Sequence, residues 1–251
     1  MLGFHDAGHG YDELGLHPPT VRRLLALTRP LYDHYFRVDS RGSEHLPRTG
    51  PAILIANHSG VLPVDGAMLW VDVVRHTDRV VRLVGDHFIA MLPFASALFA
   101  RAGVVGGSHA TIRRLLARSE LVGIFPEGVS GVAKPAGARY QLQRWPVGHA
   151  ELAIRHRVPI VPVAIVGAEE SWPVALRLRW LRPFGAPYLP VPWTPLPMPV
   201  RYHLRYGAPL ELYQDHRPAD ADDPAVVADA AARTREAVRA LLAAALAERD
   251  R

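Results

Sequence analysis

The chain has 251 residues, 49% apolar and 21% charged, with a formal net charge of +5 and a sequence pI near 9.9. This size suits one large domain with a sizeable core. The absence of cysteine excludes disulfides and thiolate chemistry. The basic balance fits an anionic lipid surface or an acidic substrate. Without zinc-finger spacing or an RNA-binding aromatic signature, nucleic acid is not expected as a partner.

Residues 1–36 predict an N-terminal part made of a polar arm and one amphipathic helix. The arm, residues 1–18, is expected to be mobile, and the helix, residues 20–36, begins at Thr20 and is disturbed at Pro30. Arginine combined with leucine, valine and tyrosine is typical of helices that lie on a membrane surface. We expect neither a signal peptide nor a run of the ~20 apolar residues that a spanning helix needs.

Strands and helices alternate through the second predicted part, residues 37–251. Strands are predicted at 37–41, 52–56, 80–84, 121–125, 160–166 and 201–206, and helices at 63–75, 87–102, 108–118, 146–155 and 219–251. This alternation predicts an α/β fold, a single central mixed sheet flanked by helices. Pro162 requires an end, an edge or a bulge in its strand. Residues 172–200, rich in tryptophan and proline, predict a long irregular insertion, and such loops are usually either functional or disordered.

Polar residues follow two of the predicted strands. Asn57 and His58 come directly after one apolar run, and Glu127 and Gly128 come after another. The carboxyl ends of strands are where α/β proteins collect their chemistry. A histidine can act as a general base when a carboxylate orients it, and Asp65 lies within one loop of His58. The pattern therefore predicts a catalytic cleft between two strand ends.

Other interpretations of these residues remain open. His58 could be a structural histidine, Asp65 a favourable charge at a helix N-terminus, and Glu127 a surface carboxylate. Ser59 could be a nucleophile, but the chain lacks the Gly-x-Ser-x-Gly elbow of serine hydrolases. Gly128 and Gly131 would let a substrate approach the backbone closely.

Three motifs in order resemble the glycerolipid acyltransferase family, which includes the 1-acylglycerol-3-phosphate acyltransferases. They are Asn57-His58 with Asp65, then residues 125–128 (Phe-Pro-Glu-Gly), then the apolar residues 158–163. The resemblance spans about residues 37–207. It implies transfer of a fatty acyl group from acyl-CoA or acyl-carrier protein to a hydroxyl of a lysophospholipid or related glycerolipid. It also implies His58 as general base, Asp65 as its orienter, and no metal or tightly bound cofactor.

The resemblance further implies where the two substrates bind. The residues expected to bind the acceptor are Asn57, Glu127, Gly128 and the basic candidates Arg101, Lys134, Arg139 and Arg144. The acyl chain is expected to bind near Ile160, Val161 and Val163. The acceptors of the family are lipids, so we expect peripheral contact with the cytoplasmic face of the cell membrane through residues 20–36 and 172–200.

The sequence departs from the family pattern at two places. Six residues separate His58 from Asp65 where the family has four, so Asp72 and Asp86 are alternative orienters. The arginine that grips the acceptor phosphate is missing from residues 103–108, and Val129-Ser130 replaces a Thr-Arg pair. These departures leave three alternatives: a neutral or non-glycerol hydroxyl acceptor, a thioesterase, or a catalytically silent protein that binds membrane lipid.

Overall fold

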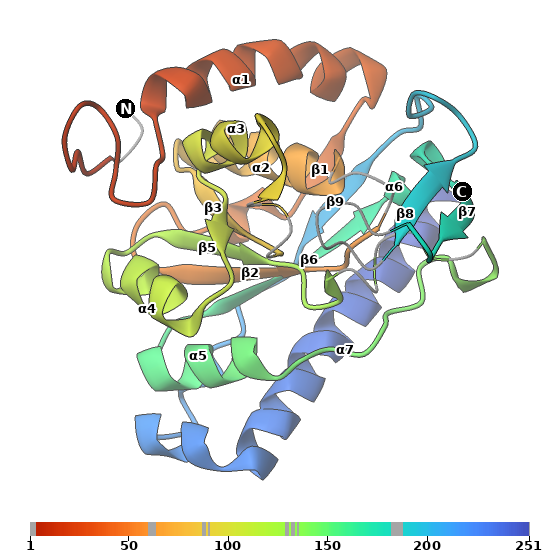
Figure 1. The fold of residues 1–251 in the computed structure, drawn as a ribbon. Coiled ribbons are helices and arrows are strands. Elements are labelled where there is room, and N and C mark those ends of the chain that lie inside the picture. The colour runs from red at the N-terminus through yellow and green to blue at the C-terminus, as the bar shows by residue number, and fades with distance from the viewer. Residues whose placement is uncertain are drawn as a thin grey trace.

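A computed structural model (Figure 1) describes residues 4–59, 64–86, 89, 91–128, 131, 134, 136–181 and 188–250. A seven-stranded mixed sheet in the order β1-β9-β6-β2-β5-β3-β4 forms its centre. The strands are β1 (Asp39–Arg41), β2 (Ala52–Ala56), β3 (Val81–Gly85), β4 (Val105–Gly106), β5 (Leu121–Ile124), β6 (Ile160–Val166) and β9 (His203–Tyr206). Strands β2 to β6 run parallel to one another, and β9 with its parallel neighbour β1 runs against them.

Helices cover both faces of this sheet. They are α1 (Pro18–Pro30), α2 (Val64–Thr77), α3 (Ala95–Ala102), α4 (His109–Ala117), α5 (Gly148–His156), α6 (Ala168–Ser171) and α7 (Pro224–Arg249). Short turns of other helices lie at Leu31–Tyr35 (η1), Ser43–His45 (η2), Ala136–Ala138 (η5) and Pro218–Asp222 (η7). In Figure 1, α1, α2 and α3 lie on one face, and α4, α5 and α7 lie on the other. The predicted α/β fold, with its N-terminal helix, is confirmed.

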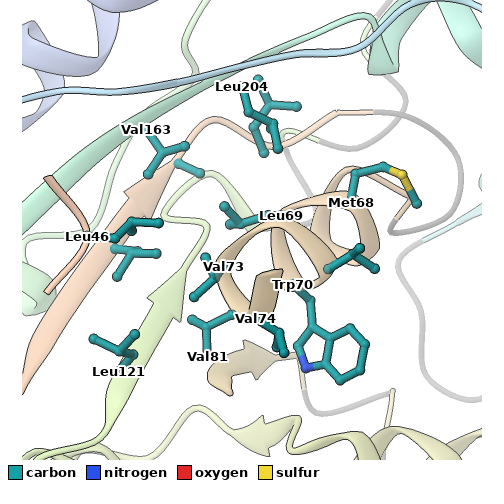
Figure 2. Close-up of a cluster of buried hydrophobic side chains, with 14 of the residues drawn as sticks. Leu46, Met68, Leu69, Trp70, Val73, Val74, Val81, Leu121, Val163 and Leu204 are labelled. Atoms are coloured by element: carbon teal, nitrogen blue, oxygen red, sulfur yellow. The ribbon is translucent and has the colours of Figure 1, made fainter. Parts of the chain in front are cut away.

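Strand β2 is buried on both faces because it lies at the middle of the sheet. Leu54 faces the core beneath α2, where it joins side chains such as Leu69 and Val163 (Figure 2). Its neighbours Ile53 and Ile55 point to the opposite core, against α4 and α5. A strand covered on both sides is apolar at every position instead of alternating, which is the pattern of residues 52–56.

Pro162 lies within a central strand, at a place where its missing N–H costs no ladder bond. On the β9 side, Ile160 exchanges two backbone hydrogen bonds with Leu210, and regular pairing resumes only at Val163 with Tyr206. The partner segment carries one extra residue between these two pairs. The interruption is a bulge, which is one of the contexts that the sequence required for this proline.

The N-terminal arm differs from the predicted mobile segment. Asp12 accepts hydrogen bonds from the backbone N–H groups of Leu14 and Leu16, at 2.8 and 2.7 Å, and so folds the chain into a tight turn. Its other oxygen pairs at 2.5 Å with the buried Arg82 of β3, which also pairs with Glu120 at 3.1 Å. Arg82 is the second residue of β3, and Glu120 directly precedes β5. This contact therefore clamps the arm to the amino edge of the sheet.

The predicted helix over 20–36 is interrupted where the sequence places Pro30. Helix α1 ends there, and the chain continues through the wider turn η1 to Tyr35. The apolar side of α1 faces inward: Val21 is buried and Leu24 and Leu25 pack against the core, while Leu27 is 72% exposed. The helix therefore packs on the same core as the sheet and leaves few apolar side chains outside.

Residues 172–200 are more regular than the predicted insertion. The described residues include an antiparallel pair, β7 (Val174–Leu178) and β8 (Leu189–Pro192), which we call the hairpin. Residues 182–187, between these strands, lie outside the described residues. After β8 the chain returns to the N-terminal part, because Tyr35 Oη and Arg37 Nη2 each donate at 2.6 Å to the carbonyls of Pro197 and Pro199.

The helices within the described residues are too short or too polar for a membrane-spanning segment.

Candidate active site

The carboxyl ends of β2 and β5 bring the two predicted strand ends together. The strands are parallel neighbours, with Ile55 opposite Ile124, so the residues that follow them emerge at the same edge of the sheet. His58 follows β2 and Glu127 follows β5. Their contact is direct, because the backbone N–H of His58 donates to Glu127 Oε1 at 3.3 Å. We call this edge the catalytic edge.

Asp65 reaches His58 despite the longer spacing. The carboxylate lies in the first turn of α2, and its Oδ2 is 2.7 Å from His58 Nδ1 and 2.9 Å from the backbone N of Ser59. Asp65 Oδ1 accepts from the N–H of Gly66 at 2.7 Å. Because the carboxylate accepts, Nδ1 of His58 carries the proton and Nε2 keeps its lone pair. This is the tautomer that a general base requires.

The surroundings of His58 set its protonation. Burial alone would lower the pKa of His58, but the charge of Asp65 and its hydrogen bond outweigh burial, so the pKa is raised above the usual value. Glu127 adds to this rise and Lys134 opposes it. The ring of Phe125 lies 4.7 Å from the imidazole, centroid to centroid, and covers one side of it. The Asp65 side chain is fully buried, whereas that of His58 is 15% exposed. The imidazole is therefore the member of the pair that a substrate can reach.

The alternative orienters lie elsewhere. Asp72 is buried in its own group of hydroxyl donors, Ser40 at 2.9 Å, Tyr206 at 2.5 Å and Tyr32. Asp86 is exposed after β3. Pro63 and Val129-Ser130, where the sequence departs from the family pattern, lie outside the described residues.

Asn57 braces the sheet instead of facing the cleft. Its Nδ2 donates at 2.9 Å to the carbonyl of Ile165, and its Oδ1 accepts at 2.8 Å from the N–H of the same residue. The side chain thus continues the β2–β6 ladder by one step beyond Ala56. This position differs from the predicted acceptor contact, because both ends of the amide are already engaged inside the protein.

Glu127 is likewise a buried residue of the loop rather than an open anchor. Besides His58 N, its carboxylate accepts from the N–H of Gln143 at 3.1 Å and pairs with Lys134 Nζ at 2.8 Å. Gly128 follows with φ of +50°, a conformation that glycine adopts without strain. A Cβ on Gly128 would meet no atom within 4 Å, so there is open space beside this backbone; its contact with an acceptor stays a prediction.

Lys134 differs most from its prediction as an anion-binding residue. Its side chain is only 2% exposed, and its Nζ lies between two carboxylates, 2.8 Å from Glu127 and 3.4 Å from Glu169. The positive charge of Lys134 is already neutralised by two buried carboxylates, so its attraction for an acceptor phosphate is weak.

The other basic candidates lie apart from this cluster. Arg101 is exposed at the end of α3, where its carbonyl accepts from His17 N at 3.0 Å. It stands beside the clamped N-terminal arm, toward the amino edge of the sheet, which is the wrong edge for His58. Arg139 and Arg144 are exposed on the segment that precedes α5. Their prediction as acceptor contacts remains open.

The predicted acyl-chain residues are core residues in this structure. Ile160, Val161 and Val163 are fully buried in β6 and pack into the two cores on either side of the sheet. Their side chains hold the strand that Asn57 braces. An acyl chain would reach them only if the core opened, because a central strand has no exposed face.

Two residues shape the site in ways that the sequence did not predict: Gly131, expected to leave room for a substrate, and Glu169. A Cβ on Gly131 would lie 2.7 Å from Glu127 Cβ and 2.9 Å from the His58 carbonyl, so only glycine lets this turn pack against the His58 loop. Glu169, the second partner of Lys134, follows β6 at the catalytic edge. The sequence held one signal for Glu169: it is a carboxylate that follows the predicted strand 160–166, as Glu127 follows the strand 121–125. In the described part of the chain, no group of three or more His, Asp or Glu side chains is arranged to hold a metal ion.

Comparison with known families agrees with the motifs. The family profile described as Acyltransferase matches residues 37–166, which contain both strand ends. The chain belongs to the acyltransferase family.

Relatives share most of the chain. An uncharacterised protein of Mycobacterium tuberculosis is 37% identical over 257 aligned residues, which cover 96% of this chain and 71% of that protein. A bovine protein named DGAT1/2-independent enzyme synthesizing storage lipids is 30% identical over 80% of this chain and 58% of its own length. Its human counterpart is 29% identical, over 80% and 59%.

A solved structure has the same fold. The 1-acyl-sn-glycerophosphate (LPA) acyltransferase PlsC of Thermotoga maritima superposes with a TM-score of 0.60 and 14% identity, over 92% of this chain and 80% of that one. The shared architecture supports the description of the sheet and the helices on its two faces.

Proposed function

We propose that this protein transfers a fatty acyl group from the thioester of acyl-CoA or acyl-carrier protein to a hydroxyl of a lipid acceptor, with His58 as general base. The observation that carries the proposal is the 2.7 Å contact of His58 Nδ1 with the buried Asp65. It leaves Nε2 of the partly exposed imidazole free to accept a proton. Membership of the acyltransferase family supports the reaction type.

The chemistry needs a base and close approach more than a covalent intermediate, because a thioester is already activated. His58 Nε2 takes the proton of the acceptor hydroxyl while its oxygen attacks the thioester carbonyl carbon. The C–S bond then breaks, and the thiolate leaves with the proton that the imidazolium returns. Asp65 stabilises the transient positive charge on the ring, as carboxylates do in other histidine bases.

The first acceptor to consider is a lysophospholipid, since PlsC, which shares the fold, is named for one. A second candidate is a neutral or non-glycerol hydroxyl compound. One observation favours it: Lys134 is buried between two glutamates, and Arg101 stands toward the opposite edge of the sheet. The relatives named for the synthesis of storage lipids are consistent with this candidate.

The test is release of free CoA from long-chain acyl-CoA in the presence and absence of acceptors. Lysophosphatidic acid, a monoacylglycerol, a diacylglycerol and a long-chain alcohol form the panel. We expect release that depends on one acceptor class and falls about 10²–10⁴-fold in His58→Ala. Unchanged turnover in this variant would refute the proposed base.

Two further outcomes address the remaining alternatives. CoA release without any acceptor would identify a thioesterase. No release with any acyl-CoA or acyl-carrier protein, from a folded protein that still binds lipid, would identify a catalytically silent lipid-binding protein. The close pairing of Asp65 with His58 argues against this last alternative, because a silent scaffold has no need to orient the imidazole.

We propose, further, that the protein contacts the membrane peripherally, on its cytoplasmic face, chiefly through the hairpin and the segment that follows β8. Trp180, Trp193 and Leu196 are 79%, 73% and 71% exposed there. Tryptophan suits the headgroup layer of a bilayer. Helix α1 contributes less, because its apolar side faces the core and Leu27 is the most exposed apolar residue on it.

Vesicle co-sedimentation tests this contact. With vesicles of phosphatidylcholine and phosphatidylglycerol, we expect the double variant Trp180→Ser, Trp193→Ser to bind several-fold less than the wild type. Val147→Ser removes an exposed apolar side chain beside α5, on the face of the sheet opposite to α1, and should bind normally. Equal binding by all three proteins would contradict the contact.

A further inference from the structure

The single lysine of this chain is a buried side chain. Lys134 is the only lysine among 29 lysine and arginine residues. Its side chain is 2% exposed, and the two carboxylates beside it, on Glu127 and Glu169, are 0% and 4% exposed. A buried ammonium is strongly unfavourable unless it is paired, and the pairing here is with two negative charges. We call these three residues the buried cluster.

The buried cluster joins three segments of the catalytic edge. Glu127, after β5, receives the N–H of His58 and the N–H of Gln143. Glu169, in α6 after β6, receives the N–H of Tyr140 at 2.9 Å. Lys134 bridges the two carboxylates. The ammonium therefore holds the loop that carries His58 to the segment before α5 and to the end of β6.

The neighbouring turn fits tightly against the same loop. Gly131 packs so closely that a Cβ would meet Glu127 and the His58 carbonyl below 3.0 Å. Three residues further along the chain, Lys134 enters the buried cluster. Gly131, three residues before the ammonium, thus packs directly on the histidine loop. A displacement of either one should therefore displace the other.

The charges that face His58 come from three elements. Asp65 of α2 pairs with its ring, Glu127 after β5 binds its backbone, and Lys134 stands behind Glu127. Glu127 raises the pKa of His58 and Lys134 lowers it. Burial raises the pKa of Glu169, and Lys134 opposes that rise. Without the ammonium, the imidazole would face two carboxylates with nothing to offset them.

We propose that Lys134 is a positioning residue for His58: through Glu127 it fixes the histidine loop, and its charge cancels the negative charge that Glu127 would otherwise exert on the imidazole. It acts through Glu127 and does not touch the acceptor. The inference rests on the proposed function of His58 as a base, but its charge balance can be measured without any turnover.

The experiment is an NMR titration of the His58 imidazole in the wild type and in charge variants of the buried cluster. The His58 resonance is assigned as the one absent from His58→Gln. Lys134→Met keeps the length of the side chain and removes its charge, so the pKa of His58 should rise by about 0.5–1 unit. Glu127→Gln should lower it by a similar amount. The double variant Lys134→Met, Glu127→Gln should return close to the wild type.

Controls separate the possible outcomes. Arg233→Met removes one positive charge from an exposed site on α7 and should leave the titration of His58 unchanged. If Lys134→Met does not fold, Glu127→Gln and the double variant still test the cancellation. Equal His58 titration in all cluster variants would overturn the proposal, even if acyl transfer were demonstrated. Shifts of the expected signs would support it, even if no acceptor supported turnover.

Turnover adds a second readout once an acceptor is known. Lys134→Met should lower kcat and move the acid limb of the pH profile upward, with the KM for the acceptor unchanged. A rise in the KM of a phosphorylated acceptor, with no change in the pH profile, would instead assign Lys134 to anion binding and overturn the positioning role.

Discussion

One carboxylate oxygen of Asp65 holds both the ring and the backbone of the histidine loop. Its Oδ2 lies 2.7 Å from His58 Nδ1 and 2.9 Å from the N of the next residue, Ser59. Asp65 therefore fixes the tautomer of the base and the course of the chain beside it. The six-residue spacing changes how the loop is filled, but it does not separate the two side chains.

Replacing Asp65 by Asn should damage the rate more than binding. An amide can donate to Nδ1 and so favour the wrong tautomer, with no charge to stabilise the imidazolium. We expect kcat to fall about 10²–10⁴-fold with little change in KM, measured as acceptor-dependent CoA release. The matched control is Asp86→Asn, an exposed aspartate near the same edge, which should retain wild-type activity. Equal losses in the two variants would contradict the role of Asp65.

Activity should fall on the acid side at a pH above the usual histidine value. Only neutral His58 can accept a proton. Burial lowers the pKa of His58, but the charge of Asp65, its hydrogen bond and the charge of Glu127 together outweigh burial and raise it. The acid limb of kcat/KM should therefore have its midpoint above about 6.5, and activity should be lost as the pH falls through it. Glu127→Gln should move this midpoint to lower pH. A wild-type midpoint at or below 6.5 would show that Asp65 does not dominate.

The main role of Asn57 should be to stabilise the fold, and its replacement should lower the free energy of unfolding. Asn57→Ala leaves the N–H and the carbonyl of Ile165 without partners inside the protein. We expect a loss of about 2–4 kcal/mol in the free energy of unfolding, measured by denaturant titration. Gln141→Ala removes an exposed amide that donates to one backbone carbonyl, and it should cost less than about 0.5 kcal/mol. Similar costs for the two variants would contradict a bracing role.

Gly131 and Gly137 form a matched pair of glycines. In Gly131→Ala, the new methyl group would lie 2.7 Å from Glu127 Cβ and 2.9 Å from the His58 carbonyl, so the histidine loop must move. In Gly137→Ala it would meet no atom within 4 Å. We expect acyl transfer to fall at least about tenfold in the first variant, because small displacements at a reacting centre are costly. The second variant should behave as wild type, and a tenfold loss in both would remove the steric explanation.

His149 should make the fold sensitive to acid. It is buried on α5 against Trp145, and burial lowers the pKa of His149 to about 4. Between about pH 6.5 and that value, the unfolded chain holds a proton at this position that the native protein does not. The free energy of unfolding should therefore fall as the pH falls through this window, by up to about 3 kcal/mol in total.

The variant His149→Gln should show a flatter dependence of stability on pH over the same window, measured by denaturant titration at several pH values. His5→Gln, at an exposed position, should keep the wild-type slope. If the His149 variant keeps that slope too, the acid sensitivity arises elsewhere.

The sheet and the meeting of His58 with Glu127 could be predicted because local pattern determines both. Residues 52–56 are apolar throughout, as a strand covered on both faces must be, and the polar residues that follow mark the carboxyl end. Ser108 shows the same locality: it begins the helix predicted at 108–118, and its Oγ accepts from the N–H of Thr111 at 3.1 Å as the cap of α4.

What could not be predicted depends on contacts between distant parts of the chain. Nothing adjacent to Lys134 in sequence indicates that Glu127 and Glu169 will surround it. Asp12 lies in a polar stretch that predicts mobility, yet its partner Arg82 is a charged residue within a strand. Both errors have one cause, since a charged side chain is assigned to the surface until a buried partner is known.

The clamp between Asp12 and Arg82 also decides how this protein can be attached to a sensor. Asp6 is exposed on the clamped arm, at the edge of the sheet opposite to His58. The chain has no cysteine of its own, so Asp6→Cys would give a single thiol for coupling. A protein immobilised there would present its cleft and its hairpin to the solution, and lipid particles could be delivered to it without obstruction by the support.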